Sequence, residues 1–266
     1  MRSNTRHPDP ADSAAACRPE PCASREQTAV IDLHFAVVDV ETTGLDPAGT
    51  RMVEIAIVEM DRSGRLIDEF STLLAIPGDG PLGAEFIHRI SRPMLARAPR
   101  FEDVAQTICQ RLSGRIIVGH VVAFDIGHLS GEFTRAGLMM PSLIDSTLCT
   151  RDLARVVLPP GPKTLAACCE ATGIEHKAAH TALGDARATA GLLVTLLRSG
   201  FDPGLDALSA AAGEIAWPDL DYLDPIPKRR SRFANWLRAR GILSHPPAPS
   251  RLRSDVARPP SPRLGR

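Results

Sequence analysis

An apolar run from residue 34 to residue 41 contains two acids, Asp39 and Glu41, and this combination restricts the possible folds more than any other feature. The run is apolar on both faces, which is typical of a central strand covered by helices on either side. The two acids are two positions apart, so on a strand their side chains point to one face. Two buried anions side by side repel each other unless a cation lies between them. The run therefore predicts an α/β fold with a cation site on its central strand.

The rest of the pattern predicts a mixed central sheet flanked by helices. Strands at 52–60 and 66–74 follow the first strand without an intervening helix, which favours an antiparallel meander. The later elements that we expect are helices at 101–112, 124–136, 147–157, 164–172 and 181–197, strands at 115–119 and 143–145, and weaker short helices at 205–212 and 232–240.

The composition divides the chain into three parts. Residues 1–30 are interpreted as a disordered leader, residues 31–200 as the folded domain, and residues 201–266 as a Pro- and Arg-rich extension that is largely irregular. From Lys228 to Arg266 there are eleven Lys or Arg and one Asp, which leaves 20 basic and 30 acidic residues elsewhere. A basic tail of this kind is compatible with a nucleic-acid partner, and equally with a solvated disordered end.

The cysteine pattern indicates a reducing compartment. The six cysteines show no disulfide-framework spacing, and the N-terminal residues lack the apolar stretch of a secretory signal. No apolar run approaches the roughly 20 residues that span a bilayer. We therefore expect reduced cysteines, a cytoplasmic location and no membrane partner.

The chemistry of the acids favours a hard divalent cation. A ligand set of Asp and Glu suits Mg²⁺ or Mn²⁺, whereas zinc usually takes Cys and His at close spacing. The zinc alternative would combine His176 and His180 with Cys168 or Cys169, but no third or fourth ligand comes at a convincing spacing. Two hard ions roughly 3.5–4 Å apart can hold both the attacking and the leaving oxygen of a phosphoryl displacement.

Two further acids are candidates for the same site. Asp185 shares a helical face with Thr189, Leu192 and Leu196, so it must be paired with an interior Arg, hydrogen-bonded or bound to metal. Asp125 lies in the expected first turn of a helix, where it is either an acid stabilised by the helix dipole or a metal ligand. Glu54, on the second strand, is a competing acid that we interpret as an edge residue or a supporting neighbour of the site.

Five residues of the chain resemble the signature of the DnaQ-like 3′-to-5′ exonucleases, the DEDDh group that includes the proofreading epsilon subunit of bacterial DNA polymerase III. They are Asp39, Glu41, Asp125, His180 and Asp185. The resemblance covers residues 31–200: residues 39–45 are similar to the first family motif, 87–91 with Ala98-Pro99 to a linking segment, and 180–186 to the last motif. The middle motif departs from the family, because Val121 stands where Asn is common. That departure affects a local polar contact and not a metal ligand.

The resemblance implies a ribonuclease H-like fold and a role for each motif residue. Asp39 would bridge two Mg²⁺ or Mn²⁺ ions, Glu41 and Asp185 would complete the first ion, Asp125 would hold the second, and His180 would deprotonate the attacking water. The substrate-binding residues that it implies are Thr42, Thr43, Gly44, Leu45, His88 and Phe124. Simple core filling is an alternative role for Leu45 and Phe124, and His120 is expected to hydrogen-bond within the loop that leads to Asp125.

These expectations together predict a metal-dependent 3′-to-5′ exonuclease that releases nucleoside 5′-monophosphates from single-stranded 3′ ends. The first motif favours DNA as the substrate, with proofreading or repair as the setting and a DNA polymerase subunit as a candidate partner. One alternative is an exoribonuclease that acts on short RNA, because a few local contacts read the 2′-hydroxyl. Another is a non-catalytic nucleic-acid-binding or adaptor protein of the same fold, although all five motif residues are present.

Overall fold

The computed structural model describes residues 33–218 and residue 220. These residues form a five-stranded sheet in the order β3-β2-β1-β4-β5, in which β1 is the central strand. The strands are β1 (His34–Thr42), β2 (Met52–Asp61), β3 (Leu66–Leu73), β4 (Ile116–Gly119) and β5 (Thr147–Cys149). The central position of β1 agrees with its apolar sequence, because a strand with neighbours on both edges and helices on both faces has little contact with water.

The strand pairing changes from antiparallel to parallel at β1. Strands β1, β2 and β3 pair antiparallel, as the absence of intervening helices predicted, whereas β1, β4 and β5 pair parallel. In the β1–β2 register Asp39 lies opposite Ala56, and Glu41 lies opposite Glu54. The β1–β4 pairing ends at Val37 and Val118, so the last residues of β1 extend beyond β4.

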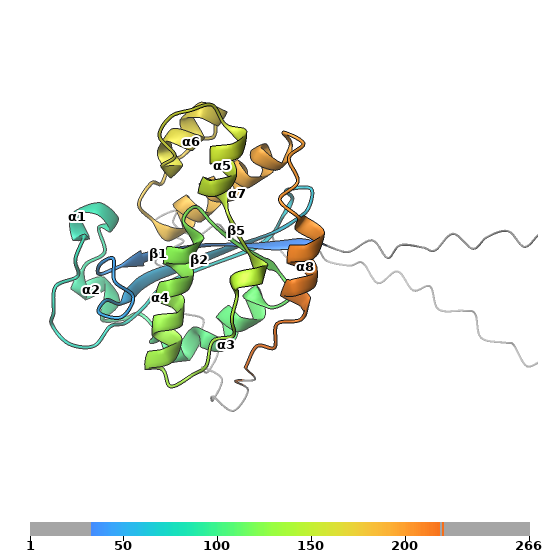
Figure 1. The fold of residues 1–266 in the computed structure, drawn as a ribbon. Coiled ribbons are helices and arrows are strands. Elements are labelled where there is room, and N and C mark those ends of the chain that lie inside the picture. The colour runs from blue at the N-terminus through green and yellow to red at the C-terminus, as the bar shows by residue number, and fades with distance from the viewer. Residues whose placement is uncertain (1–32, 219, 221–266) are drawn as a thin grey trace, which may run out of the picture. The chain divides into compact units, whose positions relative to one another are not determined.

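Helices cover both faces of the sheet (Figure 1). They are α1 (Glu85–His88), α2 (Arg92–Leu95), α3 (Phe101–Leu112), α4 (Val122–Arg135), α5 (Thr150–Val157), α6 (Leu165–Thr172), α7 (Ala182–Leu197) and α8 (Leu205–Gly213). Phe35 and Val37 of β1 pack in one core cluster with α5, α6 and α7. Ala36, Val38 and Val40 pack in the other cluster, with α3 and α4. Because side chains alternate along a strand, Asp39 and Glu41 lie on the α7 face.

The structure corrects two details of the expected elements. The strand expected at 143–145 is a 3₁₀ turn (Ile144–Ser146), and β5 follows it at residues that we had assigned to a helix. Pairing of Thr147 and Leu148 with β4 overrides the local helical pattern, so α5 begins only at Thr150. The single-turn helices α1 and α2 were not expected. The helix expected at 232–240, the leader at 1–30 and the extension beyond residue 220 lie outside the described residues.

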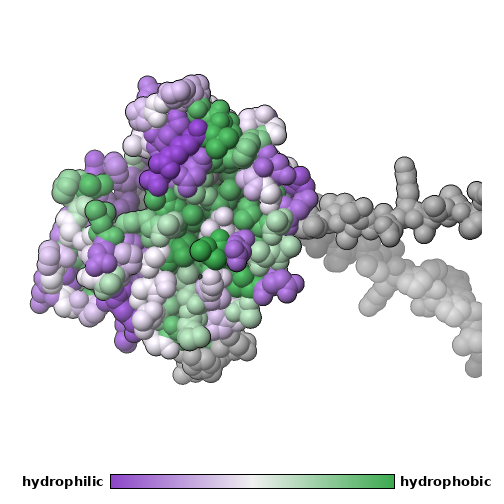
Figure 2. All heavy atoms as spheres, in the orientation of Figure 1, coloured by the Kyte–Doolittle hydropathy of each residue, from purple (hydrophilic) through white to green (hydrophobic). Residues whose placement is uncertain are grey.

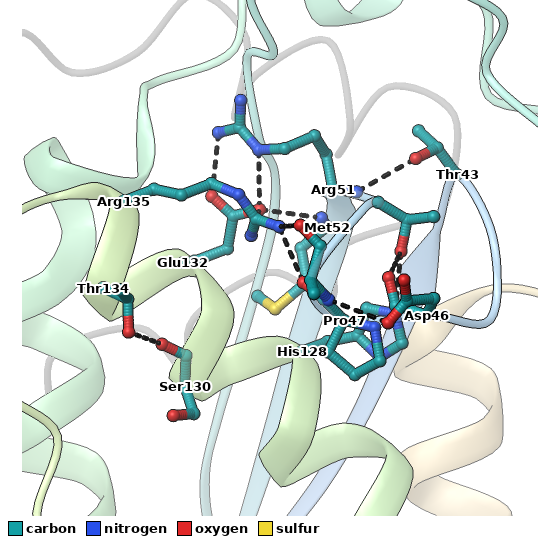
Figure 3. A network of polar contacts seen from close by, with 12 residues as sticks. Thr43, Asp46, Pro47, Arg51, Met52, His128, Ser130, Glu132, Thr134 and Arg135 are labelled. Atoms are coloured by element: carbon teal, nitrogen blue, oxygen red, sulfur yellow. Dashed lines mark hydrogen bonds and ion pairs between the residues drawn. The ribbon is translucent and has the colours of Figure 1, made fainter.

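An ion-pair network around the buried Glu132 fixes the loop after β1 to α4 (Figure 3). Arg51 donates two hydrogen bonds of 2.8 Å to the carboxylate of Glu132, which also accepts the N–H of Met52 at 3.1 Å. Arg135 contacts the same carboxylate at 3.3 Å and donates to the carbonyl oxygen of Pro47 at 2.6 Å. His128 Nε2 lies 3.2 Å from the carbonyl oxygen of Gly44. The loop is therefore held by the helix that carries Asp125.

None of the helices in the described part of the chain is long and apolar enough to cross a bilayer.

We predict that Glu132→Ala destabilises the fold by about 1–3 kcal/mol, because it leaves the half-buried guanidinium group of Arg51 and the buried N–H of Met52 without their acceptor. The matched control is Asp152→Ala, which removes an exposed ion pair with Arg155 and should cost ~0–1 kcal/mol. Urea denaturation of both variants measures the difference. Equal free energies of unfolding for the two variants would show that the network does not stabilise the loop.

Candidate metal centre

Three carboxylates meet at the end of the central strand. Asp39 and Glu41 of β1 and Asp185 of α7 each offer an oxygen, and these oxygens lie within 4.8 Å of one another. The sequence produces this arrangement in two steps. Alternation along β1 points both acids at α7, and Asp185 lies in the first turn of that helix. Thr181 caps the helix by accepting the N–H of Gly184 at 3.1 Å, which fixes where that turn begins.

Asp125 reaches the same place from the opposite face of the sheet. It lies buried in the first turn of α4, and its carboxylate accepts a backbone hydrogen bond from Val40. A Cβ built on Gly119, at the end of β4, would lie 2.8 Å from Asp125 Oδ2, so the carboxylate rests against the glycine. Asp125 thus occupies the space beside β1 that opens where β4 ends.

Burial and mutual repulsion make the carboxylate forms unfavourable. Burial, and then the charges of Asp125 and Asp185, raise the pKa of Asp39 well above its ordinary value. Burial, followed by the charges of Glu54 and Asp185, raises the pKa of Glu41 to about 7. Burial raises the pKa of Asp125 to about 8, against hydrogen bonds from its own N–H and that of Val40. A divalent cation would reverse these shifts, and the all-oxygen ligand set is the kind that hard cations prefer.

The two histidines of the last motif region differ in position. His180 is exposed and has a left-handed backbone (φ 65°) immediately before the cap residue Thr181. His176 contacts the acids instead, with Nε2 at 2.6 Å from Asp185 Oδ1. Cys168 and Cys169 are buried and free, and within the described ranges neither joins these histidines in a group of metal-type ligands. The described geometry therefore offers no support for the zinc alternative.

The remaining predicted residues shape the surface beside the acids. Thr42 donates to the carbonyl oxygen of Gly44 at 2.7 Å, and Thr43 accepts the N–H of Arg51 at 2.9 Å, so both hydroxyl groups brace the loop. Leu45 is 84% exposed, which excludes core filling as its role. Phe124 is half-buried against the α4-side core, with its ring 4.3 Å from that of His128.

The linking segment lies against the first motif. A Cβ on Gly83 would come 2.0 Å from the carbonyl oxygen of Thr43, so only glycine permits this approach. His88 closes the segment: its Nδ1 accepts the N–H of Ile90 at 3.0 Å, and its Nε2 faces the carbonyl oxygen of Leu82 at 3.3 Å. Apolar residues reach the surface around α1 (Figure 2), where Phe86 is exposed.

Some functional contacts were absent from the sequence interpretation. His128 and Glu132, which hold the loop after β1, lie three and seven positions after Asp125. That helical spacing was a usable signal of a shared face. His120 does not bond within its own loop as expected. It contacts the Thr150 hydroxyl at 3.1 Å and the carbonyl oxygen of Lys163 at 2.9 Å.

Comparison with known proteins identifies the family. A family model described as an exonuclease, RNase T, matches residues 36–193. The chain belongs to this exonuclease family. The exonuclease domain is 32% identical over 166 residues to the 3′-5′ exonuclease DinG of Bacillus subtilis, a match that covers 61% of this chain and 17% of DinG. It is 30% identical over 169 residues to the DNA polymerase III subunit epsilon of Aquifex aeolicus, covering 63% and 82% of the two chains.

Solved structures show the same ribonuclease H-like fold in other exonucleases. E. coli exonuclease I in complex with a dT13 oligonucleotide superposes with a TM-score of 0.55 at 22% identity, over 61% of this chain and 40% of that one. The nuclease domain of 3′hExo, a DEDDh family member bound to rAMP, gives a TM-score of 0.55 at 16% identity, over 64% and 94%. The chain spans less than a fifth of the length of DinG, so the likeness there concerns the exonuclease domain alone.

The raised pKa of Glu41 predicts how the metal-free exonuclease domain responds to pH. The contribution of the Glu41 carboxyl group to stability is complete below its unfolded pKa of about 4.3. It is lost as the pH rises through the folded pKa of about 7. In excess chelator at pH 8, Glu41→Gln should therefore melt at a higher temperature than the wild type, by the equivalent of ~1–2 kcal/mol. At pH 4 the two proteins should melt at the same temperature. The control Asp145→Asn changes an exposed acid and should match the wild type at both values. If the difference in melting temperature between the wild type and Glu41→Gln were the same at pH 4 and pH 8, the repulsion between the acids would be contradicted.

Proposed function

We propose that this chain is a metal-dependent 3′-to-5′ exonuclease that releases nucleoside 5′-monophosphates from single-stranded 3′ ends. The observation that carries the proposal is the meeting of Asp39, Glu41 and Asp185 within 4.8 Å, in a chain of the exonuclease family. Asp125 adjoins them from the other face of the sheet. Such a concentration of acids without a cation is unfavourable, which supports a function that requires the cation.

The proposed ligands are Asp39, Glu41, Asp125 and Asp185, and the proposed ions are two Mg²⁺ or Mn²⁺. When bound, such ions lower the pKa of water and stabilise charge on the attacking and leaving oxygens of a phosphodiester. The water oxygen attacks the terminal phosphorus, and the bond from phosphorus to the 3′ oxygen of the preceding nucleotide breaks. The departing 3′ oxygen takes a proton from solvent, so the products are a nucleoside 5′-monophosphate and a new 3′-hydroxyl end.

We propose His180 as the general base that accepts the proton of the attacking water. Its exposed position at the end of the Glu175–Ala179 segment leaves its ring accessible to a substrate, and imidazole accepts protons near neutral pH. His176 contacts Asp185 directly, which suits a residue that holds a ligand and not one that meets water. These two roles lead to different kinetic consequences.

The surface beside the acids suits an unstacked nucleotide. The loop from Thr42 to Leu45 is held rigidly by α4, and Leu45 projects into solvent from it. Phe124, next to Asp125 in α4, and the exposed Phe86 of α1 add apolar area, and bases stack on apolar side chains with little sequence preference. We propose single-stranded 3′ ends as the substrate class on this basis, with His88 supporting the linking segment.

DNA is the favoured substrate of the proposal. Two relatives support it by their own names: exonuclease I was captured with a dT13 oligonucleotide, and the Aquifex relative is a polymerase III subunit. A polymerase subunit as partner and a role in proofreading or repair belong to the same proposal, as does a cytoplasmic location. The rivals are an exoribonuclease, for which the rAMP complex of 3′hExo is the parallel, and a non-catalytic adaptor.

A digestion experiment with end-labelled substrates tests the activity. We expect the protein to shorten 5′-labelled single-stranded DNA stepwise, and to release the label of 3′-labelled DNA at once, with Mg²⁺ or Mn²⁺ and not with excess chelator. Asp39→Ala and Asp185→Ala should abolish turnover. Faster turnover of matched RNA would favour the exoribonuclease, and inactivity with every metal would favour the adaptor.

Substitution of the two histidines separates the base from the ligand-holding residue. His180→Ala should lower kcat by roughly 10²–10⁴-fold while the Mn²⁺ concentration needed for half-maximal rate stays the same. His176→Ala should raise that Mn²⁺ requirement, and high Mn²⁺ should recover most of its rate. If His176→Ala instead lost kcat at saturating Mn²⁺ and His180→Ala did not, His176 would be the base.

A further inference from the structure

A fifth acid, Glu54, lies beside the metal-ligand candidates and is more deeply buried than Asp39, Glu41 or Asp185. It lies on β2, opposite Glu41 in the β1–β2 register, and is 8% exposed. Two residues later Ala56 packs in the α7-side core, so Glu54 points toward α7 as well. In the described part of the chain no Lys or Arg forms an ion pair with it. A buried carboxylate without a cationic partner requires another source of compensation.

The first backbone amide of α7 supplies this compensation. Glu54 Oε2 accepts the N–H of Ala182 at 3.1 Å, across 128 residues of sequence, and Oε1 lies 3.4 Å from the hydroxyl group of Ser71 on β3. The first N–H groups of a helix have no acceptor within the helix, and the positive end of the helix dipole also favours an anion there. Glu54 therefore joins the start of α7 to β2 by a buried hydrogen bond.

The same helical turn carries Asp185. The N–H of Asp185 donates to the carbonyl oxygen of Thr181 at 3.0 Å. Thr181 is the residue immediately before Ala182, which is fully buried. Asp39 and Glu41 are fixed by the β1–β2 ladder, whereas Asp185 reaches them only if the helix begins at the right place. The hydrogen bond from Ala182 to Glu54 is thus the direct polar connection between the turn that carries Asp185 and the strand beside β1.

We propose that Glu54 is a positioning residue that holds the first turn of α7 against the sheet and so brings Asp185 to Asp39 and Glu41. The proposal deepens the proposed function, because it explains how the ligand group is assembled from two elements. Glu54 acts as a hydrogen-bond acceptor for Ala182. It is not a fifth ligand, since its two carboxylate oxygens lie on the N–H of Ala182 and the hydroxyl group of Ser71.

Three substitutions of Glu54 separate the acceptor from the charge. Glu54→Gln keeps an oxygen that can accept the N–H of Ala182 but removes the negative charge. Glu54→Asp keeps the charge but is one methylene too short to reach, and Glu54→Ala removes both. The matched control is Glu59→Gln, which changes another buried acid of β2 that pairs with Arg111 and Arg115 instead.

Amide hydrogen exchange of the metal-free proteins tests the positioning without any metal. We expect the amides from Ala182 to Asp185 to stay protected in Glu54→Gln and in the Glu59→Gln control. In Glu54→Asp and Glu54→Ala they should exchange at least about tenfold faster, because the first turn of the helix frays. Wild-type protection in Glu54→Asp or Glu54→Ala would overturn the proposal.

Calorimetric titration with Mn²⁺ then tests the consequence for the ligand group. Glu54→Gln should bind within about threefold of the wild type, and Glu54→Asp roughly 10–100-fold more weakly, the usual loss when a residue supporting a metal ligand is removed. Equal losses in Glu54→Gln and Glu54→Ala would mean that Glu54 acts by charge or as a ligand, and would overturn the proposal. A wild type that binds no Mn²⁺ would refute the proposed function, while the exchange data would still decide the role of Glu54.

Discussion

Repulsion between carboxylates at the end of β1 is the constraint on which the rest of the structure depends. Asp39 and Glu41 are placed on one face by the alternation of a strand, and Asp185 is added to them by the first turn of α7. Burial and the charges of neighbouring acids raise the pKa of Asp39 and the pKa of Glu41. The hydrophobic core on both sides of the sheet must supply the free energy that holds them together when no cation is present.

The surrounding polar contacts serve to place these acids and not to neutralise them. Glu132 fixes the loop after β1 through two arginines, and Glu54 receives the start of α7. Both are buried acids, yet they differ in compensation, because one is paired with cations and the other with a backbone amide. The Glu132 network is therefore an ordinary stabilising ion pair. Near Glu54 and the clustered acids, by contrast, an added Lys or Arg would compete with a bound metal ion.

The sequence was informative where burial leaves a periodic signal. The apolar run of β1 predicted the central strand, and the core-facing stripe of α7 marked Asp185 as an acid in need of compensation. The fold class and the clustering of three acids could therefore be predicted. The position of β5 could not be predicted, because its three residues form a strand only by pairing with β4, which is a long-range contact. The contact between Ala182 and Glu54 was also out of reach, since a backbone amide has no sequence signature.

The shortness of β4 has a consequence for how the fold tolerates change. The acids come from both faces of one sheet, and a sheet is normally a continuous barrier between its faces. They meet because β4 stops at Gly119 while β1 continues, which leaves a gap through which Asp125 approaches Val40. Lengthening β4 would restore the barrier and separate the two halves of the site, whereas lengthening the turn between β2 and β3 would not. The end of the sheet opposite the site is therefore where the fold can accept a longer chain without disturbing the acids.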